Sequence, residues 1–297
     1  MPDSSATSAA SATPATPAIA IVTGGNGGIG LELVRGLARA GRRVILAGRD
    51  ARACEEAAAV VRREVRDEAR VVAWPLDLAS LASVRAFAAR ARAELPRLDI
   101  LVCNAGVWPG ARRTTADGFE LAFGVNHLGH FLLVRELEPL LRASAPARIV
   151  VLSSGLHVRG RMAWDDLQHA RGRYRGTDAY AASKLANLLF TFALARRLAG
   201  TGVTANAAHP GLVKTRLGRE LPELLMKLSG PLLRTPARGA ETPLFLALSP
   251  EVATVTGRYF DDRKPRKPSP VALDRASQER LWSISEQLVR APREPRR

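Results

Sequence analysis

Short apolar runs alternate with longer stretches of helical period along this chain from residue 18 onward. Seven runs rich in apolar and β-branched residues are predicted to be strands, at 18–23, 43–47, 71–74, 100–103, 148–153, 203–207 and 258–260. Amphipathic stretches between and after these runs predict helices at 28–40, 51–67, 80–94, 117–141, 178–199 and 274–290. Continuous apolar strands separated by helices are typical of a parallel sheet covered on both faces. We therefore expect one doubly wound α/β domain with about seven strands.

The two ends of the chain and one internal segment do not fit this alternation. Residues 1–17 are mainly Ser, Ala, Thr and Pro, with Asp3 as the only charge, so a flexible tail is predicted before a single domain at 18–291. Glycine and proline break up residues 212–235 after the sixth predicted strand, and a substrate loop is expected there. Residues 292–297 are predicted to be a basic tail.

A glycine-rich segment joins the first predicted strand to the first predicted helix. It reads Thr23-Gly24-Gly25-Asn26-Gly27-Gly28-Ile29-Gly30. Glycines permit a tight turn and let backbone N–H groups approach a pyrophosphate, which the N-terminus of the helix also attracts. A plain glycine-rich turn is the alternative. The strand before the segment and the helix after it favour a dinucleotide site in a Rossmann-type fold.

Tyr180 and Lys184 are four residues apart on a predicted helix and therefore lie on one face of it. An ammonium beside a phenol stabilises the phenolate, so the pKa of Tyr180 is predicted to fall and the phenol to exchange protons at working pH. Lysine suits this role better than arginine because its charge is compact. Ser153 and Ser154 end the fifth predicted strand, at the edge where open α/β sheets bind ligands. Strand alternation directs only one of the two hydroxyls to the site.

Several separate motifs occur in the order found in one family of oxidoreductases. They are residues 23–30, Asp77-Leu78, Asn104-Ala105-Gly106, Asn126, Ser153-Ser154, Tyr180-x-x-x-Lys184 and Pro210-Gly211. Over roughly residues 18–260 the chain resembles the short-chain dehydrogenase/reductase family, in its non-extended branch. Residues 183–187 (Ser-Lys-Leu-Ala-Asn) and 209–215 (His-Pro-Gly-Leu-Val-Lys-Thr) are most similar to the retinol-dehydrogenase-like subgroup.

The resemblance implies roles for individual residues. The implied catalytic residues are Asn126, Ser154, Tyr180 and Lys184. Cofactor contacts are implied for Thr23, Gly24, Asn26, Gly28, Ile29, Gly30, Arg49, Asp77, Leu78, Asn104, Ala105, Gly106, Tyr180, Lys184, Pro210, Gly211, Val213 and Thr215. In the family the lysine also binds the nicotinamide ribose, and the asparagine helps to hold a water that relays protons to the lysine. A structural role for Asn126 within a helix crossing is the alternative.

The end of the second predicted strand bears on the choice between NAD and NADP. An NAD enzyme typically places an acidic residue there for the ribose 2′-hydroxyl, whereas a nearby arginine accommodates a 2′-phosphate. By the family resemblance Gly48 takes the acidic position and Arg49 follows it, which favours NADP over NAD. Asp50 is the alternative acid, unless it caps the next helix. Asp77 is implied to contact the adenine amino group, and it can also serve as a carboxylate near a helix start.

Composition limits the partners. The formal net charge of +16 invites a nucleic-acid-binding hypothesis, but the arginines are scattered through Ala-rich stretches, so no specific nucleic-acid partner is expected. The basic cluster at 263–267 is predicted to be an exposed loop. Cys54 and Cys103 are too few for a disulfide framework and fit a reducing, cytoplasmic location. No metal-ligand spacing occurs, and no apolar run of about 18 residues predicts a transmembrane segment.

Several conspicuous side chains are left without a predicted role in the reaction. His127 and His130 share a helix and are predicted to be structural. His157 contacts substrate or solvent, and His209 is predicted to shape the nicotinamide loop. Trp108 either lines the pocket or packs in the core.

The sequence thus predicts an NADP(H)-dependent oxidoreductase that interconverts a carbonyl and a primary or secondary alcohol, with Tyr180 as the acid and base. A catalytically silent NADP-binding regulator on the same fold is one alternative, and a damaged Tyr/Lys/Ser/Asn set would be expected of it. A basic nucleic-acid binder is the other. Members of the family commonly pair through the helices predicted at 117–141 and 178–199, so a homodimer or homotetramer is expected.

Overall fold

The computed structural model describes residues 17–213 and 233–290. Within them, eight strands form one sheet in the order β3-β2-β1-β4-β5-β6-β7-β8. The strands are β1 (Ile19–Thr23), β2 (Arg43–Gly48), β3 (Val71–Pro75), β4 (Ile100–Cys103), β5 (Ala147–Leu152), β6 (Val203–His209), β7 (Tyr259–Asp261) and β8 (Lys264–Arg266). Neighbours from β3 to β7 are parallel, and β8 is antiparallel to β7. The order reverses between β1 and β4, which is where such sheets bind their ligands.

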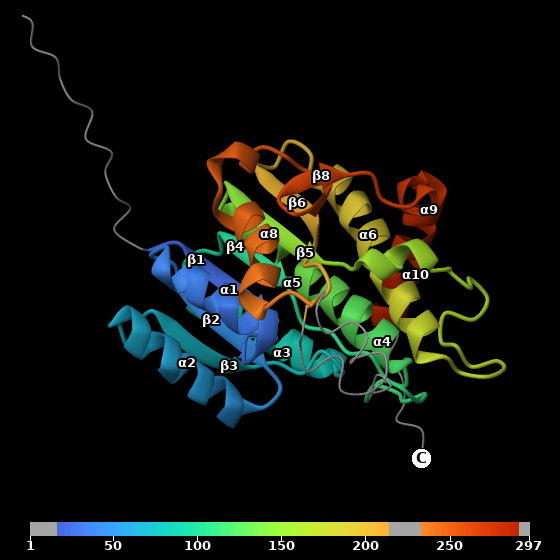
Figure 1. Ribbon diagram of the computed structural model, residues 1–297, viewed down its shortest axis with the longest axis horizontal. Helices are drawn as coiled ribbons and strands as arrows, with labels where there is room; N and C mark the ends of the chain where they lie inside the picture. The colour runs from blue at the N-terminus through green and yellow to red at the C-terminus, as the bar shows by residue number, and fades with distance from the viewer. Residues whose placement is uncertain (1–16, 214–232, 291–297) are drawn as a thin grey trace, which may run out of the picture.

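Helices cover both faces of the sheet (Figure 1). On one face lie α1 (Gly28–Arg39), α2 (Ala51–Val65) and α8 (Pro236–Leu248). The other face is covered by α3 (Leu81–Glu94), α5 (His130–Ala143) and α6 (Gly176–Arg197), and α10 (Arg275–Arg290) packs on the outside of α6. The shorter segments are α4 (Leu121–Phe123), the π turn η1 (Gly124–Gly129), the 3₁₀ turns η2 (Gly155–Arg159) and η5 (Pro250–Val252), and α9 (Pro270–Leu273).

The strand residues divide between two cores because successive side chains point to opposite faces. Ile19 and Ile21 of β1 pack with α3, α5 and α6, whereas Ala20 and Val22 of the same strand pack with α1, α2 and α8. Apart from Thr23 and Arg148, the residues of the central strands β1, β4 and β5 are apolar. The prediction of a doubly wound parallel sheet covered on both faces is therefore confirmed.

All seven predicted strands are present, and the sheet has one strand more than expected. The additional strand, β8, falls in the basic cluster 263–267, so the prediction of a loop there is wrong for Lys264–Arg266. This strand is three residues long, fully exposed and at the edge of the sheet. Lysine and proline on an edge strand discourage pairing with other molecules.

Two helical regions also differ from the prediction. The helix predicted at 117–141 is divided into α4, η1 and α5, since the backbone widens into a π turn at Gly124–Gly129. α8 was not predicted, because Pro236 and Pro243 interrupt its sequence. Pro236 lies in the first turn, where no N–H partner is needed, and Thr235 caps that turn. Thr215, most of the predicted substrate loop and nearly all of both predicted tails lie outside the described residues.

Candidate active site

The carboxyl ends of β1 and β4 are tied together by hydrogen bonds. Thr23, the last residue of β1, accepts the backbone N–H groups of Asn104 and Ala105 at its Oγ1, at 2.9 and 3.0 Å. The Asn104 amide Nδ2 donates to the carbonyl of Thr23 at 2.8 Å. The turn after β4 is therefore fixed against the start of the glycine-rich segment, as a shared wall for a bound dinucleotide requires.

The glycine-rich segment leaves room for a ligand at the N-terminus of α1. Gly24 and Gly28 both have positive φ, at 65° and 53°, which favours glycine. A Cβ atom at Gly30 would lie 2.0 Å from the carbonyl oxygen of Gly24, so the loop and the helix can pack this closely only with glycine. Gly27 caps α1 without a side chain, and the N–H groups of the first helical turn remain suited to an anion. These residues fit a dinucleotide pyrophosphate.

The end of β2 has no space for an acidic side chain. A Cβ atom at Gly48 would lie 2.6 Å from Cys54 Sγ and 3.6 Å from Asn26 Oδ1. Asp50 caps α2 by accepting the N–H of Ala53 at 3.0 Å, which supports the capping alternative for this carboxylate. Arg49 is exposed at the same strand end.

Asp77 and Leu78 follow β3. The Asp77 carboxylate accepts the N–H of Ala79 at 2.9 Å, and its own N–H donates to Ser83 Oγ at 3.0 Å, so it organises the turn before α3. Ser80, not Asp77, caps that helix. Leu78 is buried, with its carbonyl against η1.

Tyr180, Lys184 and Ser154 lie together at the carboxyl edge of β5. Tyr180 and Lys184 are 7% and 4% exposed, so both reactive groups are almost completely removed from bulk water. Lys184 Nζ lies 5.5 Å from the centre of the Tyr180 ring and donates to the carbonyl of Leu152 at 3.2 Å. The side chain of Ser154 lies close enough to the Tyr180 hydroxyl to lower the pKa of the phenol.

Burial decides the ionisation of both groups. Desolvation raises the pKa of Tyr180 to about 12, and the adjacent side chain of Ser154 opposes this rise. Desolvation lowers the pKa of Lys184 to about 8. The expectation that Lys184 lowers the pKa of Tyr180 is therefore wrong for the protein by itself, because burial outweighs the distant ammonium. At neutral pH the site holds a neutral phenol next to a mainly protonated lysine.

The two serines after β5 have different partners. Ser153 is buried, and its hydroxyl donates to the backbone carbonyl of Lys184 at 2.8 Å. Ser154 is only partly buried and is the serine that reaches Tyr180. The geometry thus separates a packing serine from one that can contact a substrate oxygen.

Asn126 occupies the π turn η1 and is completely buried. Its amide bonds to Val107 in both directions, accepting the N–H at 2.7 Å and donating to the carbonyl at 3.0 Å. The amide also donates to Ser183 Oγ at 2.9 Å. These bonds support the structural alternative for the side chain. A Cβ atom at Gly106 would lie 3.3 Å from Asn126 Oδ1 and 3.5 Å from Lys184 Nζ, so the three residues converge.

The segment after β6 lies beside the serine. His209 Nδ1 accepts the N–H groups of Gly155 and Gly211 at 3.2 and 3.3 Å, so this histidine shapes the turn at Pro210-Gly211. Val213 and Ile29 both lie against Gly239 of α8, within 3.2 Å of where its Cβ would be. Ile29, which follows β1, and Val213, which follows β6, are both predicted cofactor residues and thus lie close to each other.

Three side chains near the reacting groups were not assigned to the site from the sequence. The indole of Trp108 stacks on the Tyr180 ring, with centroids 4.3 Å apart and planes 5° apart. His157 is buried between the Ser154 carbonyl, at 2.7 Å from Nδ1, and the Ser269 N–H, at 3.1 Å from Nε2, so it contacts neither solvent nor an open pocket. His130 bonds to Thr23 and Asn126. Each of the three has one partner that is distant in sequence (Tyr180, Ser269 and Thr23, respectively), so no local spacing identifies them.

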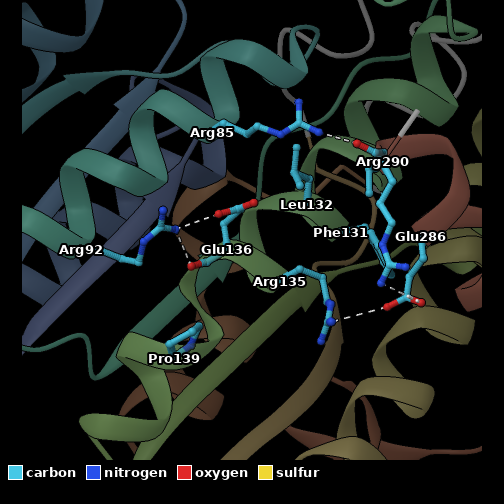
Figure 2. Close-up of a pocket in the computed structure, with 10 residues that line it drawn as sticks. Arg85, Arg92, Phe131, Leu132, Arg135, Glu136, Pro139, Glu286 and Arg290 are labelled. Carbon is cyan, nitrogen blue, oxygen red and sulfur yellow. Dashed lines mark hydrogen bonds and ion pairs between the residues drawn. The ribbon is translucent and has the colours of Figure 1, made fainter. Parts of the chain in front are cut away.

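A cavity of about 500 Å³ lies away from these residues, among α3, α5 and α10. Figure 2 shows arginines and glutamates around it, with Arg92 bonded to Glu136, and Arg135 and Arg290 directed at Glu286. Arg85 donates to the carbonyl of Val289. None of the predicted site residues that the structure describes lines this cavity, and its charges are already paired.

Similarity to known proteins establishes the family of this chain. Residues 18–224 match the short chain dehydrogenase family, and the chain belongs to that family. Within it the chain is retinol-dehydrogenase-like. It is 47% identical to retinol dehydrogenase 14 of Homo sapiens over 287 residues, which cover 91% of this chain and 85% of that protein. It is also 47% identical to retinol dehydrogenase 13 of Homo sapiens over 277 residues, covering 91% and 83%. The chain is thus a short-chain dehydrogenase/reductase that acts on alcohols or carbonyls.

Solved structures show the same architecture. A crystal structure from Mycobacterium paratuberculosis is 35% identical, with a TM-score of 0.76, and covers 94% of this chain and 97% of that chain. The NADP active-site complex of RhlG from Pseudomonas aeruginosa is 32% identical, with a TM-score of 0.66, and covers 82% and 93%. No helix in the part of the chain that the structure describes is long and apolar enough to cross a membrane.

Proposed function

We propose that this protein is an NADP(H)-dependent oxidoreductase that interconverts a carbonyl and a primary or secondary alcohol, with Tyr180 as the proton donor and acceptor. The observation that carries the proposal is the buried Tyr180, adjacent to Ser154 and next to the buried Lys184, at the edge where β1, β4 and β5 end. When bound, NADPH supplies the hydride.

The side chains divide the remaining work. Ser154 and Tyr180 are placed to hold one substrate oxygen between two hydroxyls. In the direction of reduction, Tyr180 gives its proton to this oxygen, and the raised pKa keeps the phenol protonated until then. Lys184 stabilises the phenolate that forms, because a buried ammonium opposite a new negative charge acts in a medium of low dielectric. Trp108 closes one face of the phenol against water.

The choice of NADP rests on the end of β2. Gly48 faces Cys54 with no room for an acidic side chain, and Asp50 is engaged as a helix cap. Arg49 is exposed beside them and offers a guanidinium to a 2′-phosphate. Two relatives from Pseudomonas aeruginosa were solved with NADP and NADPH, which supports the same preference.

The replacement Arg49→Ala tests this choice. We expect the dissociation constant of NADPH to rise about tenfold or more, because a charge-assisted contact to the phosphate is lost, and that of NADH to stay unchanged. Fluorescence titration with both cofactors measures it. Equal NADPH binding in the variant and the wild type contradicts the assignment. The matched control is Arg52→Ala, because Arg52 is also an exposed arginine and lies near the start of α2.

A panel of aldehydes and ketones with NADPH tests the activity. We expect turnover by the wild type and a loss of at least about a thousandfold in Tyr180→Phe, which keeps the ring stacked on Trp108 but has no proton to give. If the wild type binds NADPH but turns over none of the substrates, and Tyr180→Phe behaves in the same way, the catalytically silent regulator is favoured. The complete set of Ser154, Tyr180 and Lys184 supports the enzyme.

The location and assembly belong to the same proposal. Cys54 and Cys103 are both free and buried, which supports a reducing compartment such as the cytoplasm. A homodimer through α5 and α6 would have to include α10, because α10 covers α6. Light scattering on the purified protein measures the assembly.

A further inference from the structure

His130 lies between the two halves of the candidate active site. It is the first residue of α5 and only 1% exposed. Its Nε2 is 2.8 Å from Thr23 Oγ1, at the end of β1, and its Nδ1 is 3.1 Å from the backbone carbonyl of Asn126 in η1. One imidazole thus joins the cofactor wall to the turn that contains the asparagine.

The partners determine which nitrogen carries the proton. The Asn126 carbonyl can only accept, so Nδ1 must donate and therefore carries the proton. In the neutral ring Nε2 is then an acceptor, and the Thr23 hydroxyl donates a hydrogen bond to it. Thr23 Oγ1 in turn accepts the N–H groups of Asn104 and Ala105. The carbonyl of Val102, at 3.4 Å from Thr23 Oγ1, is a second and more distant acceptor for the same hydroxyl, so the shorter bond at 2.8 Å is the one to His130.

Each end of the chain has a separate function in the proposed reaction. The Thr23 end orients the turn at Asn104-Ala105, which forms the cofactor wall. The Asn126 end fixes the backbone of a residue whose amide holds Val107 and whose position adjoins Lys184. Because the bonds run through one ring, a displacement at either end is transmitted to the other.

We propose that His130 is a positioning residue of the reaction: as the neutral Nδ1–H tautomer it holds the cofactor wall through Thr23 and the proton-transfer side through the Asn126 carbonyl. The proposal rests on the proposed function. Two titratable groups lie around His130: the Lys184 ammonium disfavours its protonation, and a charge on His130 would in turn disfavour protonation of His127. Burial also lowers the pKa of His130, to about 4, so the ring stays neutral at physiological pH.

Two replacements separate the two bonds. His130→Asn retains a donor at the place of Nδ1 and has nothing at the place of Nε2. His130→Gln retains an acceptor at the place of Nε2 and has nothing at the place of Nδ1. We expect His130→Asn to weaken NADPH binding about tenfold with little change in kcat, and His130→Gln to lower kcat about tenfold with little change in NADPH binding. Thr23→Val should reproduce His130→Asn, and the two together should be no worse than either alone.

His127 supplies the matched control. It lies on the same turn, is equally buried and bonds to Ser285 of α10, away from the cofactor wall. His127→Asn and His127→Gln are both expected to lower the melting temperature. Unlike the His130 variants, they should not differ from each other in which of the two quantities, NADPH affinity or kcat, they change. If both His130 variants lose binding and kcat in equal proportion, or lose neither, His130 is a packing residue only and the proposal is overturned.

The tautomer can be measured in the wild-type protein, whether or not the variants fold. Long-range ¹H–¹⁵N spectra distinguish the two neutral forms of each histidine, and His130 is expected as Nδ1–H. An Nε2–H tautomer overturns the proposal. The cofactor-binding and tautomer measurements need no substrate, so an absence of turnover would refute the proposed function and leave this inference separately testable.

Discussion

At the scale of single residues, Lys184 has the largest chemical consequence because it is a buried cation. Its Nζ donates to the carbonyl of Leu152, and burial lowers its pKa to about 8. The lysine therefore changes charge within the range of ordinary enzyme assays. An arginine could not do so, since its pKa lies above about 12.

This leads to a prediction for the pH dependence of carbonyl reduction. We expect kcat to fall as the pH rises through about 8, because Lys184 loses the proton that stabilises the Tyr180 phenolate. In Lys184→Arg the overall rate should be lower, since the wide guanidinium fits poorly beside Gly106, but the fall near this pH should disappear. Steady-state rates from pH 6 to about 10 measure both effects. If the fall persists in Lys184→Arg, another group causes it.

The residues that could be predicted from the sequence are those with a local signal. Tyr180 and Lys184 are one helical turn apart, and Ser153-Ser154 follows a strand, so spacing made them candidates, and the family resemblance then selected Ser154. Trp108, His130 and His157 have partners from distant parts of the chain, and only the folded sheet brings them together. The direction of the Tyr180 pKa was also missed, because burial cannot be judged from a four-residue spacing.

At the scale of elements, the π turn η1 is the unusual feature. π turns occur mostly as single turns within helices, often at functional sites. Here the wider turn contains Asn126 and His127 and ends where α5 begins with His130. Both histidines are buried, and desolvation lowers the pKa of His127 to about 3 and that of His130 to about 4.

These pKa values predict a loss of stability in acid. In the unfolded chain both histidines gain protons near pH 6.5, whereas in the folded protein they remain neutral to about pH 4 or below. Above pH 6.5 both histidines are neutral in the folded and the unfolded protein, so they cost no stability there. As the pH falls towards 4, only the unfolded chain gains the protons, and the free energy of unfolding falls. At the acid end of this range we expect each histidine to lower the free energy of unfolding by on the order of 3 kcal/mol.

Urea unfolding at pH 7, 5.5 and 4.5 measures the loss. His127→Gln has one group fewer to protonate, so its stability should decline less steeply with falling pH than that of the wild type. A parallel decline in the two proteins would show that His127 does not contribute.

Element prediction succeeded where the apolar period was long enough to be seen. Six helical regions and the seven strands β1 to β7 follow from it, whereas β8 reads Lys-Pro-Arg and has no apolar run. α8 contains two prolines, which argue against a helix until their positions in its turns are known. The π turn has no period of its own, so the sequence indicated one continuous helix there.

At the scale of the whole molecule, α10 completes the outer core. Trp282 contacts Phe131 of α5 and Phe190 of α6, with ring centroids 5.0 and 5.9 Å apart. The guanidinium of Arg197 lies 4.0 Å from the centre of the Trp282 ring, and that of Arg135 lies 5.5 Å from it. The last described helix thus joins two helices that are central to the active-site face.

Trp282→Ala should therefore be strongly destabilising. We expect the free energy of unfolding to fall by about 3–5 kcal/mol, as for other large buried aromatic side chains, because the indole is 5% exposed and leaves a cavity. Trp164 is the matched control, since its indole is only partly buried and stacks with Arg280. Chemical denaturation of the two variants measures the difference. Equal small losses would mean that α10 is attached only weakly.

The position of α10 also has a consequence for biosynthesis. The N-terminal part of a chain leaves the ribosome first, and folding tends to follow that order. The sheet from β1 to β6 can form early, but Phe131 and Phe190 receive Trp282 only when the end of the chain has emerged. Until then a nascent chain presents these aromatic rings to solvent. A ribosome stalled before residue 275 would thus hold a nearly complete sheet with an exposed apolar face, a suitable substrate for chaperones.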